Sequence, residues 1–189
     1  MTNRKDCPDS DEEQSSVPQV VPVVELSPPD PPVVEKPVPE PVDKFRISMA
    51  FTAKWEGGFV HDPVDLGGRT NLGVTQSTYD TYRRQKGLAP RDVKHLNKIE
   101  AEAVYKVLFW DPARCERCVL PLAMAYFDTC VNFGVNGGVR FLQAALGVKA
   151  DGRWGEVSEA AFMAGNNKQT AIKMCEGRIA YRHQRVREN

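Results

Sequence analysis

The chain has 189 residues, of which 41% are hydrophobic, and it carries 25 Lys and Arg against 25 Asp and Glu. These values fit one globular domain of ordinary size and exclude a fibre. No run of 18 apolar residues is present and the N-terminus lacks the apolar core of a secretory signal, so we expect neither stable membrane insertion nor signal-directed export.

The balanced charge conceals two different regions. Residues 1–43 contain 10 acidic and 3 basic side chains together with 10 of the 14 prolines, which leaves 15 acidic and 22 basic side chains in residues 44–189. Proline removes backbone donors and restrains the residue before it, so residues 1–43 are expected to be a disordered, acidic, Pro-rich tail. The basic body that follows suggests an anionic partner.

Beyond the tail, apolar spacing predicts mainly helices. The first, Phe45–Glu56, should end at Gly57-Gly58, and the glycine-rich residues 57–75 should form a loop with a small β-hairpin. Thr75 is expected to cap a helix that stops at Gly87, and Asn97 should cap another. Further helices are expected at 98–110, 119–133, 138–146, 154–164 and 167–187. The first of these should carry an apolar stripe of Ile99, Val104, Val107, Leu108 and Trp110, and the last should have Ile172, Cys175, Ile179 and Tyr181 facing inward.

Carboxylates gather where the first predicted helix ends. Glu56 is followed by Asp62, Asp65 and the pair Thr70-Asn71 within fifteen positions. Cleavage of a glycosidic bond commonly needs a protonated carboxyl for the leaving oxygen and an ionised one facing the sugar or water. Apolar neighbours of Glu56 would raise its pKa by desolvation, as an acid requires. The same residues could instead cap a loop and turn the chain.

The string EGGFVHDPVDLGGRTNLGVT, residues 56–75, resembles the hallmark of the glycoside hydrolase family 108 lysozymes, also described as secretion activator proteins. The resemblance implies a lysozyme-like α+β fold and a muramidase that acts on peptidoglycan without metal or organic cofactor. It also implies that Glu56 is the catalytic acid. A lysozyme made in the cytoplasm without a signal would reach the wall, in the periplasm or outside the cell, with the help of a holin or of secretion machinery.

Phage-type lysozymes are similar in spacing, with an Asp nine positions and a Thr fifteen positions after the catalytic Glu. That comparison implies Asp65 as the second carboxylate, with Asp62 as the alternative, because an Asp before proline also suits a turn. Because residue +15 here is Asn71 rather than Thr, either Thr70 or Asn71 could orient a water; we take Thr70 as the candidate for that role and Asn71 as a substrate-binding residue. Whether the configuration is retained or inverted stays open, because it depends on the carboxylate separation.

The resemblance continues over residues 45–185, with residues 44–115 as the catalytic segment and 116–189 as a helical peptidoglycan-binding region within one body. Asp128 and Asn132, in FDTCVNFG, share a helix face that could line a glycan cleft or satisfy a buried network. In DGRWG, residues 151–155, the first two residues form a turn by themselves. Trp110 and Trp154 could stack on sugars, but tryptophan on an apolar stripe is more often core.

The remaining features give weaker signals. Cys115 and Cys118 form a lone CxxC without a second metal-binding pair, so a zinc or redox protein is a minor alternative. Basic side chains crowd the last forty residues: Arg153, Lys168, Lys173, Arg178, Arg182, Arg185 and Arg187. They could hold the body near anionic peptidoglycan or form a solvated helix face, and no motif indicates nucleic acid. A non-catalytic peptidoglycan-binding or secretion-assisting module is the main functional alternative.

Overall fold

The computed structural model describes residues 42–53 and 69–188. The predicted tail up to residue 41 and the carboxylates Glu56, Asp62 and Asp65 lie outside these described residues. The chain divides into two units, residues 1–40 and residues 41–189, and all described elements belong to the second.

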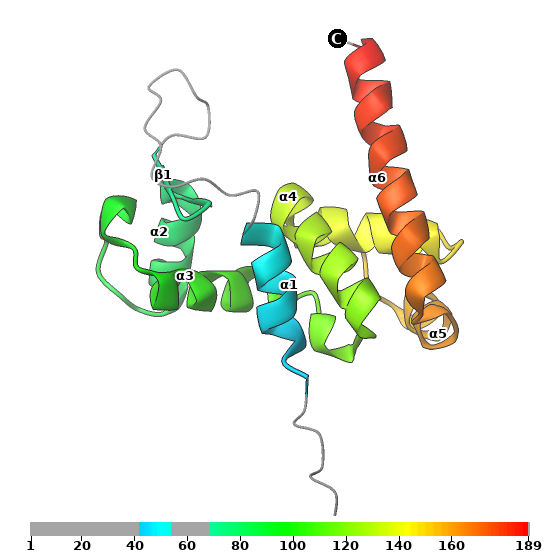
Figure 1. Ribbon diagram of the computed structural model, residues 1–189, viewed down its shortest axis with the longest axis horizontal. Helices are drawn as coiled ribbons and strands as arrows, with labels where there is room; N and C mark the ends of the chain where they lie inside the picture. Colours follow the sequence, from blue (N-terminus) through cyan, green and yellow to red (C-terminus); the bar gives the residue numbers. More distant parts are fainter. Residues whose placement is uncertain (1–41, 54–68, 189) are drawn as a thin grey trace, which may run out of the picture. The chain divides into compact units, whose positions relative to one another are not determined.

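The described part is mainly helical with one small antiparallel hairpin, which confirms the predicted fold class (Figure 1). The main elements are α1 (Lys44–Ala53), β1 (Thr70–Asn71), β2 (Val74–Thr75), α2 (Gln76–Gln85), α3 (Lys98–Tyr105), α4 (Leu120–Ala145), α5 (Glu156–Gly165) and α6 (Lys168–Glu188). Short 3-10 turns cover Val93–His95 and Cys115–Arg117, and a π-helical turn covers Lys106–Trp110. No helix of the described part is long and apolar enough to cross a membrane.

The hairpin is closed by a tight turn of two residues. Thr70 pairs with Thr75 and Asn71 with Val74, and the central residues Leu72 and Gly73 both have positive φ, 51° and 73°. Two positive φ angles are typical of the type I′ turn, whose twist matches that of the strands. Thr75 then caps α2, as predicted, since its side chain accepts a hydrogen bond from the Thr78 amide.

Helix α2 is tied to α3 through one partly buried carboxylate. Glu100 accepts hydrogen bonds from the Tyr79 hydroxyl at 2.8 Å and from Arg83 Nη1 at 2.9 Å. Burial raises the pKa of Tyr79, and the hydrogen bond to Glu100 acts in the same direction, so its hydroxyl remains a donor. The predicted cap Asn97 accepts from the Glu100 amide at 2.9 Å and fixes the start of α3.

An aromatic cluster joins α1 to the middle of the chain. The Trp110 ring is fully buried and meets Phe45 of α1 and Phe127 of α4 edge to face, at centroid distances of 5.3 and 5.5 Å. The Tyr105 ring also packs against that of Phe127, at a centroid distance of 6.4 Å. Such edge-to-face pairs contribute beyond the area they bury, so this cluster holds α1 against α4.

Helix α4 contains a sharp kink. The sequence predicted two helices, 119–133 and 138–146, separated by a connection. Two helical halves are present within Leu120–Ala145, but they meet directly at Gly134, where φ is 73° and ψ is 163°. Gly134 provides a backbone conformation that other residues rarely adopt, so a single residue replaces the predicted connection.

The stripe predicted for residues 98–110 is confirmed except at Ile99, whereas the stripe predicted for α6 is wrong in phase. Ile99 is 83% exposed, but Val104 and Trp110 are buried and Val107 and Leu108 are half-buried. In α6 the residues expected to face inward, Ile172, Cys175, Ile179 and Tyr181, are all exposed, and the buried ones are Thr170, Ala171 and Met174. In α6 the largest aliphatic side chains therefore do not mark the buried face.

Candidate functional site

The structure describes four of the predicted site residues. Thr70 and Asn71 lie on β1, and Asp128 and Asn132 lie on the first half of α4. Glu56 and Asp65, expected to carry the chemistry, lie in the segment between α1 and β1 outside the described residues. The described elements therefore show how the two ends of that segment are held: α1 on the aromatic cluster and β1 in the hairpin.

Asn71 anchors the hairpin to the chain before α3. Its Nδ2 lies 3.0 Å from the Val93 carbonyl oxygen, 3.1 Å from that of Leu96 and 3.4 Å from that of Lys94. These carbonyls belong to the short 3-10 turn and to the residue after it. Because this amide nitrogen is surrounded by backbone acceptors, it positions β1, while the predicted contact of Asn71 with substrate stays a prediction.

A glutamine side chain and an ion pair fix the same turn. Gln76 Nε2 donates to the Arg91 carbonyl at 2.9 Å, and its Oε1 accepts from the Val93 amide at 2.8 Å. Arg69, the residue before β1, pairs with Asp92. The backbone hydrogen bond from Lys94 lowers the pKa of Asp92 from its ordinary value, and the charge of Arg69 contributes. Thr70 is consequently placed by a hairpin that is fixed from both sides.

Asp128 is paired with a cation from α6. Arg178 Nη1 lies 2.6 Å from Asp128 Oδ2, and the two side chains are only 15% and 12% exposed. One turn further along each helix, Arg182 Nη2 lies 3.5 Å from Asn132 Oδ1, and Asn132 Nδ2 donates to the Asp128 carbonyl at 2.8 Å. Of the two readings left open by the sequence, the buried network is present, and a sugar contact of either residue stays a prediction.

An apolar groove runs beside this ion pair. It has a volume of about 430 Å³ and is bordered by α1, α4 and α6, with Phe51, Met124, Ile172 and Ile179 among its apolar residues and Asp128 among its polar ones. A larger groove of about 650 Å³ lies between Met49 and Ala50 of α1, Leu72 of the hairpin turn and Ala101 of α3. Both grooves thus reach α1, the helix that leads toward Glu56.

The DGRWG turn is held by a side chain that the sequence analysis did not single out. Gln143 of α4 is 1% exposed, and its Nε2 lies 3.0 Å from Asp151 Oδ1 and 2.9 Å from the Arg153 carbonyl oxygen. Its Oε1 accepts from the Gly152 amide at 2.8 Å. A glutamine inside the apolar stretch FLQAALGV was the available signal, because a buried amide needs several partners.

Both tryptophans of interest serve packing. Trp110 is part of the aromatic cluster. The ring centroid of Trp154 lies 5.6 Å from that of Phe162, and its Nε1 donates a hydrogen bond to Glu159 at 2.7 Å. Glu159 also forms an ion pair with Arg117. The Arg117 hydrogen bond, followed by that of Trp154, lowers the pKa of Glu159 to about 2. Both tryptophans therefore pack against other side chains of the protein, as the more common role of such residues predicted.

The CxxC cysteines are buried free thiols. Cys115 is the first residue of the second 3-10 turn, Cys118 follows its end, and Cys130 of α4 is buried as well. Burial raises the pKa of Cys118 to about 12 and that of Cys115 further still. Within residues 42–53 and 69–188 no group of His, Cys, Asp and Glu is placed to hold a metal ion. Such protonated, enclosed thiols are poor nucleophiles and poor metal ligands.

Comparisons with known proteins identify relatives of the chain. Residues 49–134 match the model of the family described as glycosyl hydrolase 108. The fold is similar to that of SagA from Brucella abortus, with a TM-score of 0.62 and 28% sequence identity, over 72% of this chain and 78% of that one. Among curated proteins, none matches the sequence. The matched segment includes Glu56, Asp65, Thr70, Asn71 and Asp128.

Proposed function

Because residues 49–134 of this chain belong to the glycosyl hydrolase 108 family, we propose that the protein is a peptidoglycan hydrolase. It cleaves the β-1,4 bond between N-acetylmuramic acid and N-acetylglucosamine. The observation that carries the proposal is the family match over the whole EGG to TN motif, which holds two carboxylates nine residues apart. Family 108 lysozymes are the enzymes that this motif resembles.

In the proposed reaction Glu56 donates a proton to the glycosidic oxygen as the bond breaks. Asp65 stays ionised and either stabilises the positive charge that develops on the sugar or activates the attacking water. The well-anchored hairpin supports a role for Thr70 in orienting that water, since a small error in position costs much of the rate. Asn71, Asp128 and Asn132 contribute to holding the glycan.

The charge of the body supports a polymeric anionic substrate. Residues 44–189 carry a net excess of basic side chains, and peptidoglycan carries peptide carboxylates. Long-range attraction would keep the enzyme near its substrate between cuts and would weaken as salt is added. Release through a holin or export by secretion machinery would bring it to the wall from the cytoplasm.

The proposal is tested by release of soluble glycan fragments from dye-labelled sacculi. The wild-type protein should release dye, Glu56→Gln should lose the activity, and Asp65→Asn should lose at least about 100-fold. Asp62→Asn is the matched control, because it removes a neighbouring charge of the same kind. If Asp62→Asn lost about 100-fold in activity and Asp65→Asn lost none, the role of second carboxylate would pass from Asp65 to Asp62. Sacculus binding without dye release by the wild type would instead support a non-catalytic binding or secretion-assisting module.

A further inference from the structure

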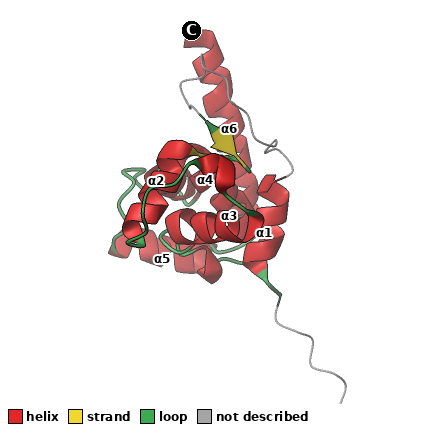
Figure 2. Ribbon diagram, turned by 90° about the vertical axis from the view of Figure 1, so that its left-hand side faces the viewer, coloured by secondary structure: helices red, strands yellow, loops and turns green. Residues whose placement is uncertain are grey.

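The groove of about 650 Å³ between α1, the hairpin turn and α3 has the size of a ligand site. Four apolar side chains line it: Met49, Ala50, Leu72 and Ala101. Helices α1 and α3 lie side by side in both views (Figures 1 and 2). In sequence, the segment that contains Glu56 connects α1 to the hairpin, which are two of the three walls. The groove therefore adjoins the elements from which the catalytic segment starts and at which it ends.

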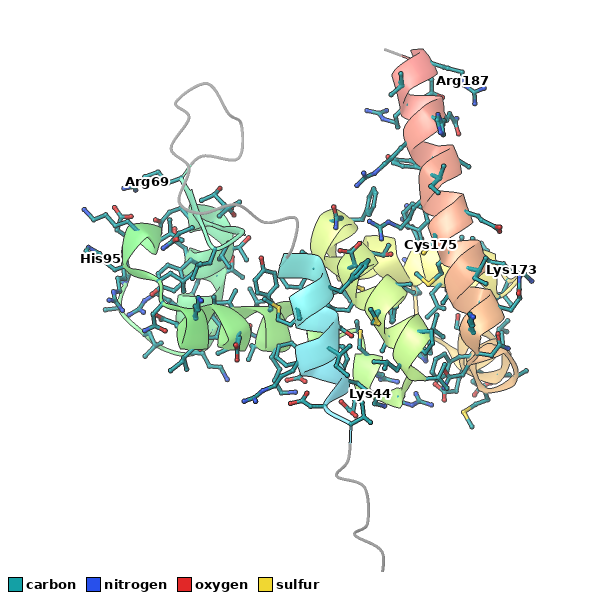
Figure 3. All side chains as sticks on the ribbon, viewed as in Figure 1. Lys44, Arg69, His95, Lys173, Cys175 and Arg187 are labelled. Atoms are coloured by element: carbon teal, nitrogen blue, oxygen red, sulfur yellow. The ribbon has the colours of Figure 1, made fainter. Side chains whose placement is uncertain are left out.

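Polar contacts hold both of these walls in place. At the start of α1, Lys44 Nζ donates to the Cys118 carbonyl oxygen at 3.1 Å and pairs with Glu116 at 3.3 Å. Before β1, Arg69 pairs with Asp92. Figure 3 shows Lys44 at the start of α1 and Arg69 at the hairpin. Because the walls are fixed in the absence of a ligand, binding in the groove has a low ordering cost.

Leu72 has an unfavourable backbone conformation for a leucine. Its φ of 51° lies in the left-handed region, and Asn or Gly is strongly preferred at this position of a type I′ turn. The Tyr105 hydroxyl donates to the Leu72 carbonyl oxygen at 3.3 Å and helps to hold the turn. Its side chain is half-buried against the core and also lines the groove. Strained residues concentrate at binding sites, and here the strained residue supplies an apolar side chain to the groove.

Three charged side chains border the apolar surface: Arg46, Lys98 and Glu102. Arg46 Nε lies 3.4 Å from Asp43 Oδ2 in an exposed ion pair. Lys98 and Glu102 are four residues apart on α3, so they lie on the same face of the helix. In the part of the chain that the structure describes, these two side chains form no ion pair. A neighbouring cation and anion without partners suit a ligand group that carries both charges.

We propose that this groove binds the peptide stem of peptidoglycan, which rests on the proposal that peptidoglycan is the substrate. Stems of the diaminopimelate type contain alanine, γ-linked D-glutamate and meso-diaminopimelate, whose free end carries a carboxylate and an ammonium group on one carbon. Lys98 binds this carboxylate and Glu102 binds the ammonium group. Arg46 binds the free carboxylate of the D-glutamate. The methyl and methylene groups of the stem pack against the apolar surface beside Leu72.

The charges of the groove favour the stem over the glycan strand. Sugar rings commonly stack on aromatic side chains, and none of the described residues that line the groove is aromatic. N-acetylated sugars also have no ammonium group for Glu102 to bind. A stem with lysine in place of diaminopimelate has the ammonium group without the carboxylate, so it would leave Lys98 without a partner. The groove therefore matches diaminopimelate best.

Isothermal titration calorimetry of the full-length protein with soluble stem peptides tests this proposal. L-Ala-γ-D-Glu-meso-diaminopimelate should bind about tenfold more tightly than L-Ala-γ-D-Glu-L-Lys, because the lysine peptide offers no carboxylate to Lys98. Lys98→Gln should abolish this preference by weakening binding of the diaminopimelate peptide alone. Glu102→Gln should weaken binding of both peptides by about fivefold, because both carry the ammonium group.

Matched variants separate the groove from the rest of the surface. Lys86→Gln and Glu156→Gln remove exposed charges of the same kinds from α2 and α5 and should change both affinities less than about twofold. Leu72→Asn, which suits the turn better, should lower both affinities by about fivefold because the apolar contact is lost. Leu88→Asn removes an exposed leucine elsewhere and should leave both affinities unchanged. Circular dichroism should show the same helix content in all variants, which separates lost contact from lost folding.

Several results would overturn the proposal. They are no binding of the diaminopimelate peptide, equal affinities for the two peptides, equal losses in Lys98→Gln and Lys86→Gln, or displacement of the bound peptide by an N-acetylglucosamine tetramer. The last result would make the groove a glycan site. The peptides contain no glycosidic bond, so their binding does not require catalysis. Peptide binding without dye release would refute hydrolysis alone, and dye release without peptide binding would refute the stem site alone.

Discussion

Breaking the ion pair between Asp128 and Arg178 should destabilise the protein measurably. Both side chains are largely buried, and the 2.6 Å contact is a charge-assisted hydrogen bond. Removing one partner leaves the other charge uncompensated in a poorly hydrated place, so Asp128→Asn and Arg178→Gln should each cost about 3 kcal/mol of unfolding free energy. The double variant should cost less than the sum, with a coupling energy of about 1.5 to 3 kcal/mol.

Urea unfolding of the wild type, both single variants and the double variant measures this coupling. Arg182→Gln is the matched control on the next helical turn, where the contact is longer and exposed, and it should cost less than about 0.5 kcal/mol. A coupling energy below about 0.5 kcal/mol would refute the conclusion that Asp128 serves the α4 to α6 packing.

Three further predictions concern packing, pH and thiols. Gly138→Ala should destabilise by about 1 to 3 kcal/mol, because its new carbon would lie 2.3 Å from Cys130 Sγ, and Cys130→Ala should restore part of the loss in the same unfolding assay. The pKa of Glu159 is lowered to about 2. The stability that ionised Glu159 contributes is therefore fully present above the ordinary carboxyl pKa of 4.5 and is lost as the pH falls toward about 2. Thermal melts of Glu159→Gln should therefore fall less steeply than those of the wild type over that range, and parallel curves would contradict this. In a Cys7→Ser background a thiol reagent should rapidly modify one cysteine, the exposed Cys175, and rapid modification of three or more would show that the buried thiols are accessible.

Local signals in the sequence were sufficient where neighbours in the chain decide the structure. Thr75 and Asn97 cap helices as predicted, because a cap depends only on the next three residues. The hairpin followed from its glycines for the same reason. The described start of α1 and the ends of α5 and α6 agree with the prediction within two residues.

The features that the sequence could not predict depend on contacts between segments far apart in the chain. The partner of Asp128 is Arg178, fifty residues away, so the sequence left its role open between sugar contact and buried network. Helical spacing defined the stripe of Ile172 and Ile179 correctly as one face, but which face α4 covers depends on packing that spacing does not encode.

Muropeptide mass analysis after borohydride reduction tests the central claim most directly. Purified sacculi are digested with the wild-type protein and with Glu56→Gln, and the reduced sugar at each new chain end is identified. The proposed reaction yields reduced N-acetylmuramic acid ends from the wild type that are missing from the Glu56→Gln digest. Reduced N-acetylglucosamine ends, or an uncut glycan in the wild-type digest, would contradict a muramidase that uses Glu56 as its acid.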